Sequence, residues 1–157
     1  MISHLNKKNK PTIVDISEKK VTTRNAIAEG TIQFSKSTFK KIKSLNTKKG
    51  EIESIAIIAG ILAAKKTSEL IPLCHNIKIE NINIDIKSLN RISSLKVSCS
   101  VDCKDKTGVE MEALTAVSIS CLTIYDMCKS LDNNIIIKNV HLVKKSGGKT
   151  TYLKNKL

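Results

Sequence analysis

The order of apolar and polar residues along the chain predicts four strands and three helices. Alternation with a period of two, or a β-prone apolar run, indicates the strands, and apolar spacings of three or four indicate the helices. The expected strands cover residues 23–35, 77–86, 95–103 and 135–143, and the expected helices follow Ser35 or Ser37, cover 51–70 and cover 109–130. The order β-α-α-β-β-α-β predicts an α+β fold, namely a ferredoxin-like sandwich with an antiparallel sheet and helices on one face.

Local departures from these patterns predict where strands bend and where helices end. Within 77–86 the apolar positions change from odd to even numbers, which indicates a bulge near Glu80. A turn near 88–91 would make the second and third strands a hairpin. Pro72 is expected to end the second helix, and Lys48-Lys49-Gly50 is expected to form a loop before it.

The helix expected over 109–130 is apolar on nearly every side. Its apolar residues are Val109, Met111, Ala113, Leu114, Ala116, Val117, Ile119, Cys121, Leu122, Ile124, Met127 and Cys128. A helix on one face of a monomeric sheet needs only one apolar stripe. We therefore predict that a second subunit covers its other face. The alternative is that the N-terminal segment of the same chain covers it.

Charged residues interrupt this apolar helix, and a charge on a core helix is usually paired, hydrated or functional. Asp126 and Lys129 are close neighbours on the helix surface, so they can form an ion pair; such a pair on an exposed surface contributes little to stability. Glu112 lies about 21 Å from Asp126 along the helix axis. One chain cannot bring Glu112 and Asp126 to one small ligand, so a site that uses both must combine two subunits.

Length and charge indicate one basic domain. The chain has 157 residues, enough for a single core, and we expect one domain over 12–157 after a flexible basic tail at 1–11. Its 27 Lys and Arg residues outnumber its 14 Asp and Glu residues, which gives a net charge of +13. This excess favours a phosphate-bearing partner, although a compositional lysine bias would produce the same excess.

Several classes of function are disfavoured by composition. The N-terminus lacks the apolar segment of a secretory signal, and the longest apolar run, 55–64, is about half of the ~20 residues that a membrane span requires, so we expect a cytoplasmic protein. Five cysteines indicate reduced thiols, and Cys99 and Cys103 lie about 13 Å apart on a strand, too far to share a disulfide or a zinc ion. Two Tyr, two Phe and no Trp disfavour a base-stacking surface for nucleic acid.

Some single residues could either bind a ligand or have no role beyond the local structure and the surface. His75 lies in a loop after Pro72 and could present its imidazole to a ligand, or it could only hydrogen-bond within the loop. Lys49, Lys65 and Lys145 could bind phosphate, the last beside the flexible amides of Ser146-Gly-Gly148, or they could be solvated surface residues. The chain has no P-loop motif.

Several ordered motifs together resemble one family. They are Val14-Asp-Ile-Ser17, Ile58-Ala-Gly60 with Ala63-Ala-Lys65, Ile71-Pro-Leu-Cys-His75, Gly108-Val-Glu-Met-Glu-Ala-Leu-Thr115, Leu122-Thr-Ile-Tyr-Asp-Met-Cys-Lys129 and Lys145-Ser-Gly-Gly-Lys149. Across roughly residues 12–150 the chain resembles the cyclic pyranopterin monophosphate synthase family of molybdenum cofactor biosynthesis. Because many long motifs coincide, the resemblance is more specific than any single pattern.

The resemblance implies a lyase that converts a cyclised dihydro-GTP to a pyranopterin with a cyclic phosphate while pyrophosphate leaves. It also implies a ferredoxin-like subunit, a homohexamer built as a trimer of dimers, and active sites at subunit interfaces. No metal or other cofactor is implied, although Mg²⁺ could accompany the substrate triphosphate.

The resemblance further implies roles for individual residues. The catalytic aspartate would be Asp126, and Lys129, Lys49 and His75 would be further proton donors or acceptors. Substrate contacts would come from Leu73, Cys74, His75, Met111, Glu112, Arg24, Lys65 and Lys145, with Lys149 in the same motif as the last. Ile27 stands where the family has a second arginine, so one phosphate contact is not expected in this chain.

Two other classes of function remain open. A basic ferredoxin-like RNA-binding module needs exposed aromatic residues on its central strands, and residues 77–86 and 95–103 contain none. A non-catalytic assembly partner fits the fold, but it would have little need for Asp126, Lys129, Lys49 and His75.

Overall fold

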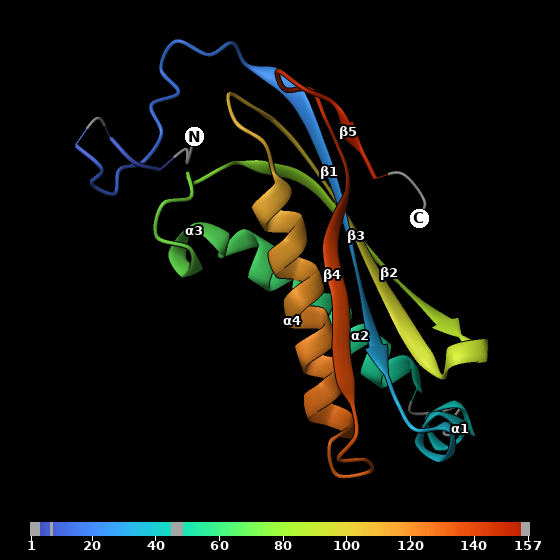
Figure 1. Cartoon of the computed structure of the whole chain (residues 1–157). Coiled ribbons are helices and arrows are strands. Elements are labelled where there is room, and N and C mark those ends of the chain that lie inside the picture. The colour runs from blue at the N-terminus through green and yellow to red at the C-terminus, as the bar shows by residue number, and fades with distance from the viewer. Residues whose placement is uncertain (1–3, 7, 45–48, 155–157) are drawn as a thin grey trace.

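The computed structural model describes residues 4–6, 8–44 and 49–154, without the side chains of residues 49 and 50. Its elements are β1 (Thr22–Gln33), α1 (Lys36–Ser44), α2 (Lys49–Lys65), α3 (Thr67–Leu70), β2 (Ile79–Leu89), the 3-10 turn η1 (Asn90–Ile92), β3 (Ser94–Asp105), α4 (Glu110–Cys128), β4 (Ile136–Ser146) and β5 (Tyr152–Leu153). An antiparallel sheet carries α2 and α4 on one face, which confirms the predicted α+β, ferredoxin-like class (Figure 1). Relative to the predicted series, the structure adds β5 and divides the second helix into α2 and α3.

The sheet has the strand order β2-β3-β1-β4-β5, so β1 lies at its centre. β1 pairs antiparallel with both β3 and β4. In the register, Thr22 is opposite Asp105 and Asn25 is opposite Ser146. The beginning of β1 therefore meets the ends of β3 and β4 at one edge of the molecule, and this edge carries the candidate site.

Strand alternation produces the core as the sequence predicts. On β3, the fully buried apolar residues are Leu95, Val97, Cys99, Val101 and Cys103. The residues between them are only half-buried, as expected for a sheet that packs helices on one face. The predicted bulge near Glu80 is confirmed by a register shift between Ile79 and Asn81.

Three predicted boundaries differ from the structure. The second helix breaks at Lys66 (φ −105, ψ 10), so α2 and α3 replace one continuous helix. The loop predicted at 48–50 is wrong for Lys49 and Gly50, which begin α2, while Lys48 lies outside the described residues. The last strand extends to Ser146, so Lys145 is held on a strand and not in a loop.

Helix α4 packs against the sheet and, beside it on the same face, against α2. The Ser120 hydroxyl donates a 2.9 Å hydrogen bond to the Ala56 carbonyl, and a Cβ on Gly60 would lie only 2.2 Å from Ser120 Oγ. Helix α2 of the same chain thus covers part of α4. Neither the predicted second subunit nor the alternative N-terminal segment accounts for this part. Exposed apolar side chains nevertheless remain on the two helices at Ile55, Ile58, Leu62 and Leu122. Cover by a second subunit stays a prediction.

Helix α4 is also, among the described residues, the one helix long and apolar enough to cross a membrane by length and composition. Half of that span is buried inside the fold. The core also holds free thiols, and burial raises the pKa of Cys99 and Cys121 to about 12. These two thiols are therefore protonated and unreactive near neutral pH.

Candidate active site

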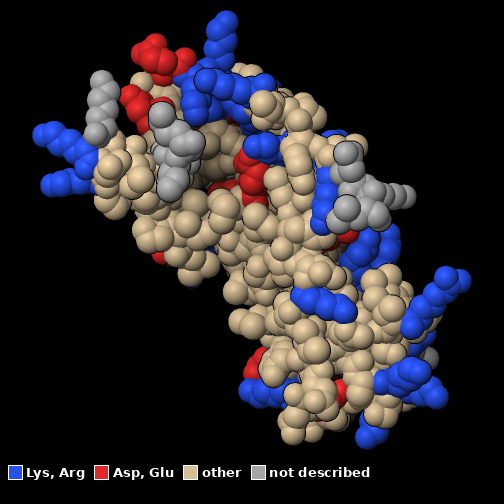
Figure 2. Space-filling view, in the orientation of Figure 1, with Lys and Arg blue, Asp and Glu red and all other residues tan. Residues whose placement is uncertain are grey.

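Two adjoining cavities lie where α4 begins. The larger has a volume of about 790 Å³ and the smaller about 430 Å³, within the usual range of small-molecule sites. Both are lined by Lys19, Thr107, Gly108, Glu110 and Lys145, so the two cavities lie side by side. In the space-filling view, acidic side chains lie in a hollow in the upper part of the molecule, and basic side chains gather above it (Figure 2).

A tight turn closes the larger cavity at the edge where β1 begins and β4 ends. Gly147 has φ +86, a left-handed conformation that favours glycine, and an added Cβ would lie 1.9 Å from the Thr23 carbonyl oxygen. The Thr22 hydroxyl donates a 2.7 Å hydrogen bond to the Gly147 carbonyl. The Ser146-Gly-Gly148 segment therefore packs directly on β1, which fixes where Lys145 lies relative to Arg24.

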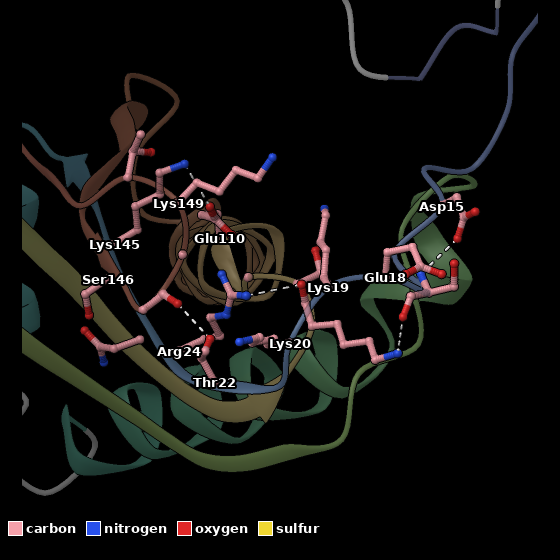
Figure 3. A pocket seen from close by; sticks show the side chains of 18 residues that line it. Asp15, Glu18, Lys19, Lys20, Thr22, Arg24, Glu110, Lys145, Ser146 and Lys149 are labelled. Carbon is pink, nitrogen blue, oxygen red and sulfur yellow. Dashed lines mark hydrogen bonds and ion pairs between the residues drawn. The ribbon is translucent and has the colours of Figure 1, made fainter.

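The larger cavity is predominantly cationic. Its basic residues are Lys19, Lys20, Arg24, Lys106, Lys145 and Lys149, against the acidic residues Asp15, Glu18 and Glu110. Figure 3 shows Lys145 and Lys149 on one side of the cavity and Lys19 and Lys20 on the other. Because cations from separate segments converge here, the cavity has the charge expected of a polyphosphate site.

Hydrogen bonds and ion pairs orient several of these cations. Arg24 donates from Nε to the Asp105 carbonyl (3.4 Å) and from Nη2 to the Lys106 carbonyl (3.2 Å). Lys106 Nζ donates to the Ser17 carbonyl (2.6 Å), which ties the segment before β1 to the end of β3. Lys145 Nζ lies 3.2 Å from Glu110 Oε1, and both side chains are about two-thirds buried.

The smaller cavity combines apolar and titratable side chains. Leu73, Cys74, His75, Met111 and Glu112 all line it, so the structure brings these five predicted contacts together. His75 Nε2 lies 2.8 Å from the Val14 carbonyl oxygen and must donate to it. In the neutral imidazole this bond leaves Nδ1 without a proton, so Nδ1 is available as an acceptor.

The same cavity contains two groups whose pKa burial raises. Burial is the main cause that raises the pKa of Glu112 to about 7; the negative charge of Glu110 adds to it, and a backbone hydrogen bond opposes it. Glu112 is only 4% exposed. Both of its protonation states are therefore populated near neutral pH, as a proton donor or acceptor requires. Burial, and then the charge of Glu112, raises the pKa of the Cys74 thiol.

The other end of α4 carries the two remaining predicted residues of this helix. Asp126 Oδ1 and Lys129 Nζ form a 2.7 Å ion pair, and their side chains are 71% and 63% exposed. The hydrogen bond from Lys129 to Asp126 raises the pKa of Lys129, which keeps this lysine protonated. Within one chain, Asp126 and Lys129 are not brought to the two cavities.

Two predicted lysines also lie outside the cavities. Lys65, at the exposed end of α2, lines neither of them. Lys49 begins α2, and its side chain lies outside the described part of the structure. Among the described residues, no three His, Cys, Asp or Glu side chains are grouped to hold a metal ion.

Sequence reasoning missed several lining residues of the site. Lys19, Lys20, Lys106 and Glu110 were not among the predicted contacts, although all of them line the larger cavity. Glu110 lies in the motif that supplied Met111 and Glu112, so the motif itself was a sufficient signal. For the three lysines the only signal was charge next to a strand end, which is too common to single them out.

Comparison with known proteins covers almost the whole chain. The model of the MoaC family matches residues 13–148. Three relatives, each named cyclic pyranopterin monophosphate synthase, come from Helicobacter hepaticus (50% identical over 149 residues; 95% of this chain and 94% of the relative), Lysinibacillus sphaericus (47% over 150; 94% and 94%) and Clostridium acetobutylicum (45% over 150; 96% and 93%). With its ferredoxin-like fold and this similarity over nearly all of its length, the chain belongs to the MoaC family.

Proposed function

We propose that the chain is a cyclic pyranopterin monophosphate synthase, a lyase of molybdenum cofactor biosynthesis. It converts a cyclised dihydro-GTP to cyclic pyranopterin monophosphate and releases pyrophosphate. The observation that carries the proposal is the pair of adjoining cavities, one cationic and one with titratable groups, in a chain whose relatives bear this enzyme's name.

The larger cavity is the proposed site of the triphosphate. Cyclisation requires a sugar hydroxyl to attack the α-phosphorus, so that a new phosphorus–oxygen bond forms while the bond to pyrophosphate breaks and the hydroxyl proton passes to a base. Negative charge then grows on the departing pyrophosphate, and fixed cations lower that barrier. Arg24, Lys19, Lys145 and Lys149 are the residues we assign to this role.

The smaller cavity is the proposed site of the purine-derived ring. Opening and reclosing that ring requires protons to move to and from several atoms. Glu112, with a pKa of about 7, can hold or release a proton near neutral pH, and His75 Nδ1 can accept one. Leu73, Cys74 and Met111 would pack against the ring and exclude water.

A second copy of the chain would supply the residues that the two cavities lack. We propose that Asp126, Lys129, Lys49 and Lys65 of a neighbouring copy complete each site, within a homohexamer arranged as a trimer of dimers in the cytoplasm. The exposed apolar side chains of Ile55, Ile58, Leu62 and Leu122 support such contacts, since large apolar groups left in water favour association.

The direct test is to incubate the purified chain with the cyclised nucleotide and to measure pyrophosphate and pterin product. We expect one pyrophosphate per product, and no pyrophosphate from GTP under the same conditions. Parallel reactions with EDTA and with added Mg²⁺ measure whether the metal that accompanies a triphosphate is needed. A folded oligomer that releases no pyrophosphate from the cyclised nucleotide would overturn the proposal.

A further inference from the structure

The proposed cyclisation requires a base close to the sugar. When the sugar hydroxyl attacks the α-phosphorus, its proton must pass to an acceptor within hydrogen-bond reach. The sugar and the α-phosphate connect the purine-derived ring to the rest of the triphosphate. With the ring in the smaller cavity and the triphosphate in the larger one, the reacting atoms lie where the two cavities adjoin.

The residues that line both cavities mark the place where the two adjoin. They are Lys19, Thr107, Gly108, Glu110 and Lys145. Among the described residues, Glu110 is the one acidic side chain that lines both cavities. Asp15 and Glu18 line only the larger cavity, and Glu112 lines only the smaller one. Glu110 is therefore the carboxylate placed to accept a proton between the ring and the triphosphate.

Two contacts place the carboxylate group of Glu110 itself at this junction. Its Oε1 lies 3.2 Å from Lys145 Nζ (Figure 3). A Cβ added to Gly108 would lie 2.0 Å from its Oε2, so the carboxylate lies over the glycine and needs the space that a side chain there would fill. The Glu110 side chain is 29% exposed, so a ligand in the cavities can reach it.

A carboxylate in a cationic cavity weakens the binding of a triphosphate, because like charges repel. In the chain alone, the ion pair with Lys145 balances the charge of Glu110. An α-phosphate oxygen at the junction competes for the same ammonium group, so Lys145 can turn from the carboxylate to the phosphate. This exchange leaves the Glu110 carboxylate free to accept a hydrogen bond from the sugar hydroxyl.

We propose that Glu110 is the base that accepts the proton of the attacking sugar hydroxyl. The inference rests on the proposed function and deepens it, because it assigns the proton acceptor of the cyclisation step. The hydroxyl oxygen bonds to the α-phosphorus as its proton passes to the Glu110 carboxylate. The bond from the α-phosphorus to pyrophosphate breaks, and pyrophosphate leaves with the electron pair of that bond. Protein kinases use an aspartate in the same way to accept the proton of a substrate hydroxyl.

Glu110→Gln keeps the size of the side chain and removes the proton acceptor. We expect the single-turnover rate of pyrophosphate release to fall roughly 10²–10⁴-fold, the usual contribution of a general base. The dissociation constant of the cyclised nucleotide should not rise, because the variant removes a negative charge from a site for a polyanion. Asp85→Asn is the matched control, since Asp85 pairs with Lys87 at 3.0 Å on β2, outside both cavities. Its rate should equal that of the wild type.

Gly108→Ala keeps the carboxylate and moves it. The added methyl group displaces the end of the flexible Glu110 side chain, and Gly108 does not have the left-handed backbone that would exclude alanine. We expect the melting temperature to be unchanged and the rate to fall by about 10–10²-fold, because a misplaced base transfers a proton less efficiently. This variant decides the question if Glu110→Gln fails to fold.

A double variant separates a base from a residue that only holds Lys145 in place. If Glu110 acts by itself on the hydroxyl, Glu110→Gln should lower the rate again in a chain that already carries Lys145→Ala. If it only orients the ammonium group, Glu110→Gln should make no further difference in that chain.

The outcomes distinguish this inference from the proposed function. If the wild type converts the nucleotide and Glu110→Gln releases pyrophosphate at the same rate, the inference is overturned and the function stands. The same holds if Glu110→Gln has no effect in the chain that carries Lys145→Ala. A folded wild type that releases no pyrophosphate overturns the proposed function, and the inference with it.

Discussion

The two ends of helix α4 differ in every property that matters for chemistry. At its beginning, Glu112 is 4% exposed and has a pKa raised to about 7, beside a cavity with converging cations. Near its end, Asp126 and Lys129 are mostly exposed and are paired with each other at 2.7 Å. The first end has the geometry of a ligand site within one chain, and the second end has the geometry of an ordinary surface.

This difference teaches that one chain assembles only part of the predicted site. Asp126 and Lys129 belong to the motifs that carry the family resemblance, yet their own chain keeps them one helix length from the cavities. Burial and charge in a single chain would not have selected them. If they act in catalysis, they act on the cavities of a neighbouring copy. Oligomers assembled from two different variants test this directly.

The largest effect is expected when a variant of the larger cavity is mixed with a variant at the far end of α4. Arg24→Ala removes a cation of the larger cavity, and Asp126→Ala removes the carboxylate at the far end; each should lower kcat/KM by roughly 10²–10⁴-fold. Co-refolding the two inactive chains should restore about a quarter of wild-type activity, because half of the random pairs are mixed and each mixed pair has one intact site of two.

The control mixes two variants of the same end. Arg24→Ala with Lys145→Ala leaves a defect at both sites of every mixed pair, since both residues line the larger cavity of one chain. This mixture should regain no activity. Equal activities in the two mixtures, at equal oligomer content by light scattering, would contradict a site shared between copies.

A smaller effect is expected in the pH dependence of stability. The pKa of Glu112 is raised from its ordinary value of 4.5 to about 7 in the folded chain, so the stability that its protonated form provides is complete below about 4.5 and is lost as the pH rises through about 7. Glu112→Gln keeps a neutral side chain at every pH. Relative to wild type, the variant should gain roughly 1–3 kcal/mol in free energy of unfolding between pH 5 and pH 8.

Urea unfolding at both pH values measures this difference. Ser118→Ala is the control, because Ser118 lies on the exposed side of the same helix and carries no titratable group. Its difference from wild type should not change with pH. A Glu112→Gln profile parallel to that of the wild type would mean that the carboxyl group is ionised in the folded chain.

The smallest effect is expected from the exposed pair at the end of α4. Lys129→Ala should leave the melting temperature unchanged within error, because ion pairs between exposed side chains contribute little to stability. Lys96→Ala is the matched comparison, since its 2.9 Å pair with Glu29 is about two-thirds buried; it should lower the free energy of unfolding by roughly 0.5–1 kcal/mol. A clear loss in Lys129→Ala would show that this pair stabilises an assembly or a contact beyond one chain.

Much of the fold could be predicted because the apolar pattern of a strand or helix is set by the residues of that segment alone. The alternation from Leu95 to Cys103 gave β3, and the slip in the pattern near Glu80 gave the bulge. The break between α2 and α3 at Lys66 was missed, because no glycine or proline stands at that position to signal it. Helix ends without a local signal depend on the packing around them.

The amino-acid sequence by itself determined the α+β class, the apolar character of α4 and the grouping of cavity residues in the short segments around His75 and Glu112. Only the tertiary structure decided that Lys19, Arg24, Lys106 and Lys145 meet. They meet because antiparallel pairing sets Thr22 opposite Asp105 and Asn25 opposite Ser146, which brings three distant strand ends to one edge. Tertiary packing likewise buries Glu112, which raises its pKa to about 7, and leaves the Asp126 side chain in water.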